Sequence, residues 1–298
     1  MAERLSFEDQ ISRNKLKSFV LMVIIFIFFL ILGYVISMIV DPSLFFIIMI
    51  FSIIISLIYI WVGYYNSDKI ALASVKAKPA SHTHHRMLYH AVENMSLASG
   101  LPMPKVYVME SQEINAFASG RDPEHAVICV TTGALAKLNK EELEGVIAHE
   151  MAHIANFDIR FMTLTAVLVG MIAIAAEVFL RSLWFSSGDR NRGNAVLIIL
   201  GILFAILAPI LAQLVSLAIS RRREYVADAT GVKFTRYPKG LANALKRIKA
   251  EHVPYADTKK YPKAVAPLFI SDPFKKKVQN LFSTHPDINE RIRRLESM

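Results

Sequence analysis

Two histidines four residues apart are the part of this sequence with the clearest chemical meaning. They belong to the pentapeptide His149-Glu150-Met151-Ala152-His153, which has the form HExxH. In an α-helix, residues i and i+4 lie on one face, so both imidazoles point at one position where a zinc ion can bind. Glu150 lies next to the first histidine and can take a proton from a water on that metal. The pattern predicts a metal-dependent hydrolase; the alternative is a chance match on an ordinary helix.

The residues around the motif predict that it lies on a helix behind a small sheet. Asn139 is a favourable N-cap, and Glu142 stands three residues later, where a capping-box carboxylate reaches back. Apolar residues then recur at helical spacing and give the helix a face to bury. They are Leu143, Val146, Ile147 and Ile154. Upstream, residues 105–109 and 126–130 are rich in β-branched side chains and are predicted strands.

Apolar residues make up 54% of the chain and are concentrated in long runs, which is typical of a membrane protein. Residues 19–40 and 44–65 form two uninterrupted runs. Each is about long enough to cross a hydrocarbon core of ~30 Å as a helix. Two further runs, 161–185 and 195–219, contain polar residues and are weaker candidates. We therefore expect about four transmembrane helices.

The positions of Lys and Arg predict the orientation of these helices. Basic residues precede the first run, follow the second and follow the fourth, whereas the hairpin between the first two runs has none. By the positive-inside rule, the N-terminus, residues 66–160 and the residues from 220 onward face the cytoplasm. The net charge of +9 is explained by this topology and by contact with anionic lipid of the bilayer. No motif indicates nucleic acid as a partner.

The soluble residues lie in two stretches, each small for an independent core, so we expect them to fold together into one catalytic domain. The expected segments, in chain order, are a cytoplasmic N-terminal segment (1–18), a transmembrane hairpin (19–65), the first half of the catalytic domain with HExxH (66–160), a second transmembrane hairpin (161–219) and the second half of the catalytic domain (220–298).

The single cysteine, Cys129, rules out an internal disulfide and fits a reducing compartment.

A third metal ligand must come from another part of the chain, because a catalytic zinc ion usually has three protein ligands and a water. The residues after 219 are expected on the same side of the membrane as HExxH. There Glu224 and Asp228 again lie four residues apart. Glu224 can bind the metal while Asp228 accepts a hydrogen bond from a ligand imidazole. The alternative is a charged interfacial helix in which Glu224 only neutralises Arg221 to Arg223.

These residues resemble the HtpX family of membrane-embedded heat-shock metalloproteases, which is related to the CaaX prenyl proteases. The likeness extends over most of the chain. It is carried by Pro104 to Val108, Asn115 to Arg121, Thr131 to Leu135, the HExxH helix continuing to Asn156 and Asp158, Glu224 to Asp228, Ser283 to Pro286, and Arg291 to Leu295. One small departure is Ser119, where the family more often has Thr.

The resemblance implies an α+β membrane protein with a mainly helical, zincin-like cytoplasmic catalytic domain and a small β-sheet. It implies a gluzincin in which His149, His153 and Glu224 bind one Zn²⁺ per subunit and Glu150 is the general base. The implied activity is endoproteolysis of misfolded or damaged membrane proteins, in quality control and the stress response. The implied location is the cell (inner) membrane, with several spans and the catalytic domain facing the cytoplasm.

The resemblance also suggests how substrate binds. An edge strand is expected at four residues, to which an extended peptide adds by backbone hydrogen bonds. They are Asn115, Ala116, Phe117 and Ala118. The alternative is an ordinary packed strand. His285 and Tyr225 are candidates, by residue type, to donate a hydrogen bond to the oxyanion. His285 can equally belong to a turn that opens the C-terminal helix.

Two other functions would fit parts of the sequence. A CaaX-type protease that processes prenylated proteins would share the zinc chemistry. It would be expected to enclose a large chamber within the membrane, which four spans in 298 residues can hardly build. A non-enzymatic receptor or transporter would explain the spans but would leave the HExxH motif and the Glu224 and Asp228 pair unexplained.

Overall fold

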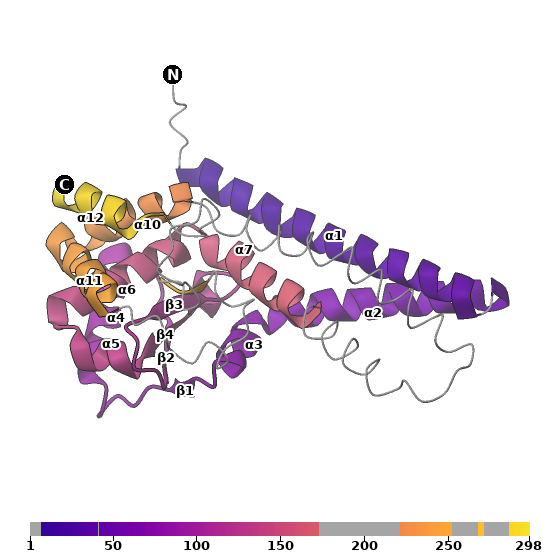
Figure 1. The fold of residues 1–298 in the computed structure, drawn as a ribbon, viewed down its shortest axis with the longest axis horizontal. Helices are drawn as coiled ribbons and strands as arrows, with labels where there is room; N and C mark the ends of the chain where they lie inside the picture. The colour runs from indigo at the N-terminus through magenta and orange to yellow at the C-terminus, as the bar shows by residue number, and fades with distance from the viewer. Residues whose placement is uncertain (1–6, 41, 173–220, 252–267, 271–285) are drawn as a thin grey trace, which may run out of the picture.

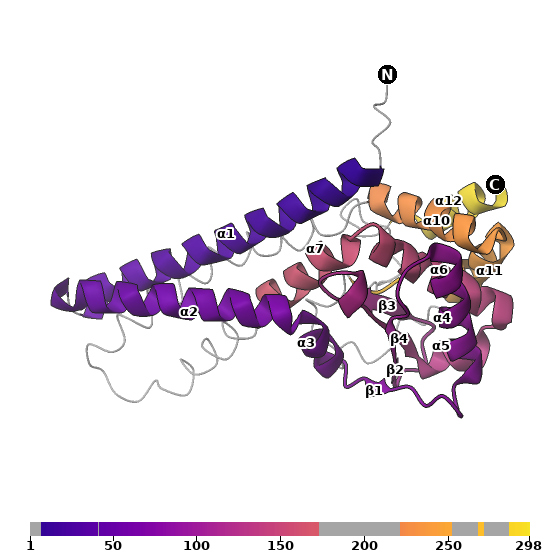
Figure 2. The same ribbon diagram turned by 180° about the vertical axis from the view of Figure 1, so that it is seen from behind.

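The computed structural model describes residues 7–40, 42–172, 221–251, 268–270 and 286–298. A hairpin of two long helices extends from a body of helices and strands (Figure 1). The first helix begins beside the C-terminal helices and runs away from the body, and the second returns to it, as the reverse view also shows (Figure 2).

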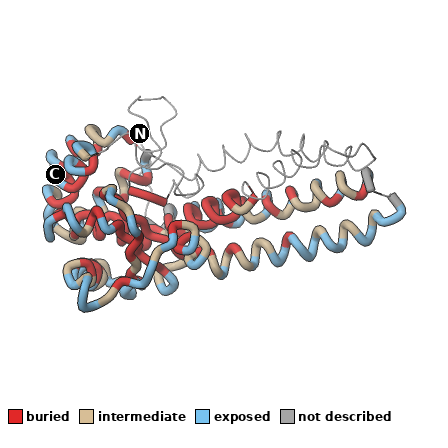
Figure 3. Tube along the Cα trace, turned by 60° about the horizontal axis from the view of Figure 1, so that its bottom comes forward, coloured by how far each residue is buried: buried red, intermediate tan, exposed pale blue. Residues whose placement is uncertain are grey.

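The hairpin consists of helix α1 (Phe7–Val40), a short 3₁₀ turn (Pro42–Leu44) and helix α2 (Phe45–Tyr65). Both helices are long and apolar enough to cross a membrane, and they cover the first two predicted spans. Only 17% of the most apolar stretch of α1 and 6% of that of α2 is buried within the protein. Exposed residues follow the hairpin along its length (Figure 3). An apolar surface of this extent is stable only when lipid covers it.

A third helix packs against the hairpin. Helix α7 (Asp158–Leu164) continues as a π-helix (Thr165–Val169), and its apolar side chains contact those of α1. The Tyr59 hydroxyl of α2 donates a hydrogen bond to the carbonyl of Leu168 over 2.5 Å, which joins this turn to the hairpin. The rest of the third predicted span beyond residue 172, and all of the fourth, lie outside the described residues.

The body contains a four-stranded sheet. Its strands are β1 (Lys78–Pro79), β2 (Lys105–Met109), β3 (Ala116–Ser119) and β4 (Val127–Thr131), in the spatial order β1-β2-β4-β3. Strands β2 and β4 pair in parallel, and the other two pairings are antiparallel. Both predicted upstream strands form, β2 at the expected residues and β4 one residue later. The predicted substrate strand forms as β3, one residue later than expected, at an edge of the sheet.

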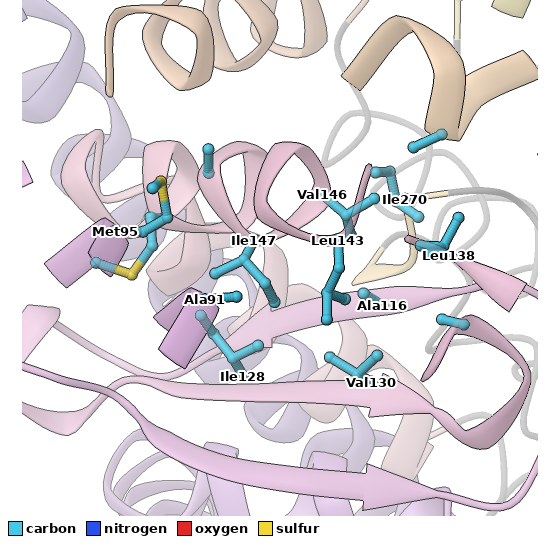
Figure 4. Close-up of a cluster of buried hydrophobic side chains, with 14 of the residues drawn as sticks. Ala91, Met95, Ala116, Ile128, Val130, Leu138, Leu143, Val146, Ile147 and Ile270 are labelled. Carbon is cyan, nitrogen blue, oxygen red and sulfur yellow. The ribbon is translucent and has the colours of Figure 1, made fainter. Parts of the chain in front are cut away.

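Strands β3 and β4 are buried at every residue. Because successive side chains of a strand point to opposite faces, both faces of the sheet are covered at these two strands. One face packs on α4 (Arg86–Ser99) and α6 (Lys140–Ala155), which carries the HExxH motif. Side chains of α6 point at the strands in Figure 4. Those labelled there are Leu143, Val146 and Ile147 from α6, Ile128 and Val130 from β4, Ala116 from β3, Ala91 and Met95 from α4, and Leu138 and Ile270. The other face packs on α3 (Ser67–Ser74) and the start of α7.

Helices from the C-terminal part of the chain pack on α6 as well. They are α10 (Arg221–Thr235), α11 (Pro238–Glu251) and α12 (Ile288–Glu296), while the short α5 (Thr132–Lys137) and a 3₁₀ turn (Pro123–His125) flank β4. The approach of α11 to α6 is close, because a Cβ atom added at Gly145 would lie 2.5 Å from the backbone nitrogen of Leu241. Helix α6 is thus enclosed by the sheet on one side and by later parts of the chain on the other.

Candidate metal centre

Helix α6 begins where the sequence predicts. The Asn139 side chain accepts a hydrogen bond from the Glu142 backbone over 2.9 Å, and the Glu142 carboxylate accepts one from the Asn139 backbone over 3.0 Å. This confirms the capping box, which satisfies backbone donors that a helix end leaves free. The HExxH residues lie in the last two turns of the helix and are all buried.

Three ligand atoms from two helices converge at this point. The Nε2 atoms of His149 and His153 lie 3.2 Å apart. The carboxylate of Glu224, from α10, places one oxygen 3.6 Å from the Nε2 of His149 and the other 3.6 Å from the Nε2 of His153. The three side chains are buried. The structure therefore brings together the three residues that the sequence and the resemblance nominate as ligands.

These spacings fit a metal ion. Two ligand atoms held about 2.0–2.1 Å from a tetrahedral zinc ion lie roughly 3.3–3.4 Å apart. The two Nε2 atoms, 3.2 Å apart, lie close to that separation, and each is 3.6 Å from one oxygen of the Glu224 carboxylate. Two imidazole nitrogens and one carboxylate oxygen are also a ligand set of catalytic zinc sites, which leave a fourth position for water or substrate.

Each ligand histidine has a carboxylate partner on its other nitrogen. Nδ1 of His149 lies 2.9 Å from Asp228, and Nδ1 of His153 lies 3.1 Å from Asp158. A carboxylate that accepts the Nδ1 hydrogen fixes the tautomer and leaves the Nε2 lone pair for a metal. The sequence suggests this role for Asp228. It gave no such role to Asp158, which is the first residue of α7 and follows a sharp change of chain direction.

Two buried arginines accompany these carboxylates, and neither was predicted from the sequence to act here. Arg291 of α12 donates to both oxygens of Asp228, over 2.7 and 2.9 Å, and lies 3.3 Å from Glu224. Arg223 lies 2.9 Å from Asp158.

The charges at the described part of this site also favour a divalent cation. The buried acidic residues are Glu150, Asp158, Glu224 and Asp228, and the buried basic ones are Arg223 and Arg291. With both histidines neutral, as metal ligation requires, and these six side chains ionised, two negative charges are left uncompensated. Buried charge is costly unless it is paired or coordinates a metal. A divalent metal ion supplies that compensation.

The surroundings shift the proton affinities of these groups. Burial acts to lower the pKa of His149, but hydrogen bonds to Asp228 and Glu224 outweigh it and raise that pKa to about 9. Burial acts to raise the pKa of Glu224, but His149 and Arg291 hold it well below the usual range. Burial raises the pKa of Glu150. Glu224 is therefore held as an anion suited to bind metal, and the pKa of Glu150 is shifted in the direction that favours a general base.

Strand β3 lies against Glu150. The backbone of Ala118 forms a hydrogen bond to the Glu150 carboxylate. On the same strand, the carbonyl of Ala116 accepts a hydrogen bond from the backbone of Ile270 over 3.0 Å. The side chain of Asn115 is buried and accepts a hydrogen bond from the Ala116 backbone over 3.1 Å. The outer edge of β3 thus adjoins the site, with one of its carbonyls bonded to another segment of the chain.

Of the two candidate oxyanion donors, Tyr225 lies among the described residues. The ring of Tyr225 lies under the Arg294 guanidinium, 3.9 Å from it, on the side of α10 that meets α12. His285 lies outside the described residues.

Two histidines and a glutamate with carboxylate partners, on a body joined to a membrane hairpin, define a membrane-bound metallohydrolase. The family described as Peptidase family M48 matches residues 82–298, and the chain belongs to that family. It is therefore a membrane-bound metalloprotease that acts on protein substrates. This supports an enzyme over the receptor or transporter alternative.

Relatives that align over most of the chain agree. The "Protease HtpX homolog" of Thermoanaerobacter pseudethanolicus is 49% identical over 247 residues, which are 81% of each chain. That of Dictyoglomus thermophilum is 41% identical over 293 residues, which are 98% of this chain and 95% of the relative. The predicted resemblance to the HtpX family is confirmed.

A solved structure shares the fold. The crystal structure of S. mikatae Ste24p aligns with a TM-score of 0.50 at 20% identity. The alignment covers 95% of this chain but only 65% of Ste24p, so this chain spans slightly less than two thirds of that protein. At this identity the likeness bears on the fold alone.

Proposed function

We propose that this protein is a zinc-dependent endopeptidase that cleaves misfolded or damaged membrane proteins on the cytoplasmic side of the cell membrane. The observation that carries the proposal is the convergence of two imidazole nitrogens and the Glu224 carboxylate on one buried position. Membership of a peptidase family supports peptide-bond hydrolysis, and the relatives are named as proteases.

His149, His153 and Glu224 would hold one zinc ion per chain. When bound, the ion supplies Lewis acidity toward a peptide carbonyl and lowers the pKa of a water. Asp228 and Asp158 accept the Nδ1 hydrogens and so hold both imidazoles in the binding tautomer.

Glu150 carries the proton during the reaction. Its carboxylate takes the proton of the attacking water and later delivers it to the nitrogen of the leaving peptide. The hydrogen bond from Ala118 holds the carboxylate against β3, next to the place where a substrate backbone would lie. Tyr225 and His285 remain the proposed sources of a hydrogen bond to the oxyanion.

The proposed substrate site is the outer edge of β3, from Asn115 to Ala118. An extended peptide would add to this edge by backbone hydrogen bonds, which select for an unfolded or extended chain rather than for particular side chains. The bond from Ile270 to the Ala116 carbonyl shows that this edge accepts a backbone donor. A substrate would have to replace that donor.

The proposed orientation places the metal centre in the cytoplasm. Basic side chains gather where the hairpin meets the body: Lys15 and Lys17 lie over the rings of Phe157 and Phe161, and Arg121 lies over that of Tyr65. Basic and aromatic side chains gathered in this way suit the headgroup region of the inner leaflet. The proposal includes several spans; helices α1 and α2 support the first two by their length and apolar composition, and α7 is the described part of the proposed third.

The test is cleavage of casein by the purified full chain in detergent, combined with metal analysis. We expect activity that a chelator removes and zinc restores. Glu150→Gln should retain bound zinc and lose cleavage, because the side chain keeps its shape but cannot accept the proton. Cleavage by that variant at the wild-type rate would overturn the mechanism. A farnesylated peptide cleaved in strong preference to its unmodified counterpart would instead favour the CaaX-type function.

A further inference from the structure

Helix α1 does more than anchor the protein, because it reaches the metal centre. Asn14 lies five residues before the apolar run that begins at Phe19. Its side chain is buried, whereas those of its neighbours Arg13 and Lys15 are exposed. A buried amide is unfavourable unless its polar atoms are hydrogen-bonded, so the partners of Asn14 indicate why a polar residue occupies this place.

Both partners of Asn14 belong to the turn that follows the HExxH helix. Its Nδ2 donates to the Asp158 carboxylate over 2.7 Å and to the backbone carbonyl of Asn156 over 3.2 Å. Both of these hydrogen bonds from the Asn14 amide therefore go to this one turn. The bonds join residues 142 and 144 positions apart in the sequence.

Asp158 connects this contact to the metal ligand. One of its oxygens receives the bonds from Asn14 and from Arg223, at 2.7 and 2.9 Å. The other oxygen lies 3.1 Å from Nδ1 of His153. Two donors on one oxygen restrict rotation of the carboxylate and so keep its second oxygen aimed at the imidazole. A chain of hydrogen bonds thus runs from the membrane helix to the ligand.

The turn itself needs support from outside. Helices α6 and α7 meet at 86°, and Phe157 between them has a φ of 56°, a left-handed conformation that a bulky residue adopts at a cost. Asn14 bonds to the residues on both sides of Phe157. The Lys15 ammonium lies 5.0 Å from the centre of the Phe157 ring. Helix α1 therefore holds the strained turn that carries Asp158.

We propose that Asn14 is a positioning residue for the metal centre, so that docking of the first membrane helix sets how tightly the catalytic domain holds its metal. The inference rests on the proposed zinc site. Its consequence is that membrane anchoring and proteolytic competence are linked: a chain whose α1 is displaced from the turn binds zinc more weakly.

The experiment measures zinc affinity by competition with a chromophoric chelator, using the full chain in detergent. Asn14→Leu keeps the number and branching of the side-chain heavy atoms and removes the donor. We expect its Kd for zinc to rise by about three- to tenfold, less than the ten- to hundredfold typical of removing a direct partner of a ligand histidine. Ser18→Ala is the matched control, because Ser18 is also buried one turn along α1, and within the described residues its hydroxyl donates to the Asn14 carbonyl and not to the turn. Its Kd should equal that of the wild type.

Two further readouts separate positioning from packing. The visible absorption of the Co²⁺-substituted protein should change in Asn14→Leu and stay the same in Ser18→Ala, since it reports ligand geometry. If Asn14→Leu does not fold, Asn14→Ser serves in its place, with a smaller rise in Kd. A wild-type Kd and Co²⁺ spectrum in the folded Asn14 variant, or equal shifts in Ser18→Ala, would overturn the inference. Failure of the wild-type chain to bind zinc at all would instead defeat the proposed function.

Discussion

Replacement of Arg291 should destabilise the metal-free protein strongly. Its guanidinium is 2% exposed and forms two hydrogen bonds to Asp228 and a close ion pair with Glu224. In Arg291→Met both carboxylates stay buried without this cation. Loss of one partner from a buried ion pair costs about 3–5 kcal/mol. At roughly 2–4 °C per kcal/mol for a domain of this size, Tm should fall by about 6–20 °C.

The assay is thermal unfolding of the chelator-treated full chain in detergent, followed by circular dichroism. Arg293→Met is the matched control, because Arg293 lies on the same helix but its side chain is solvent-exposed and pairs with Glu290. Exposed pairs contribute about 0–1 kcal/mol, so this variant should melt close to the wild type. Adding Asp228→Asn to Arg291→Met should recover part of the lost Tm, because the double variant no longer buries the Asp228 charge without its arginine partner. If Arg291→Met melts no lower than Arg293→Met, the account of buried charge at this site is wrong.

Three other changes test the surrounding structure. Asn139→Ala removes the cap of α6 and should lower the free energy of unfolding by about 1 kcal/mol, as measured by chemical denaturation; no loss would contradict the capping box. Gly145→Ala places a methyl group against the backbone of Leu241 and should cost about 1–3 kcal/mol in the same assay, and a neutral result would show that α6 and α11 are not packed this closely. Ile270→Pro removes the donor to the Ala116 carbonyl and should lower KM for an extended peptide by about two- to tenfold with zinc content unchanged; an unchanged or higher KM would argue against substrate at this edge.

Local patterns predicted the parts of the fold that depend on near neighbours in the sequence. The capping box, the HExxH helix and the first two spans follow from spacing over a few residues or from one long apolar run, and the structure has them at the expected places. The strands were displaced by at most one residue. Strand ends depend on pairing with partners that a single segment does not reveal, so such shifts are expected.

The supporting residues of the metal centre could not be found in this way, because their roles depend on tertiary contacts. Arg291, Arg293 and Arg294 occupy one short helix and look alike in sequence, yet only Arg291 is buried against the site. Asn14 precedes an apolar run, where polar residues are common, so the sequence alone does not single it out. Asp158 differs, since it lies five residues after the second histidine, close enough to suggest a partner for it once the helix is known to end at Ala155.

The central claim is that Glu224 completes a metal centre with His149 and His153. The most direct measurement is the zinc content of the purified full chain by elemental analysis, for the wild type, for Glu224→Ala and for Glu296→Ala, an exposed glutamate on α12. The account predicts about one zinc per chain in the wild type and in the Glu296 variant, and little zinc in the Glu224 variant. Full zinc occupancy in a folded Glu224→Ala protein would contradict it.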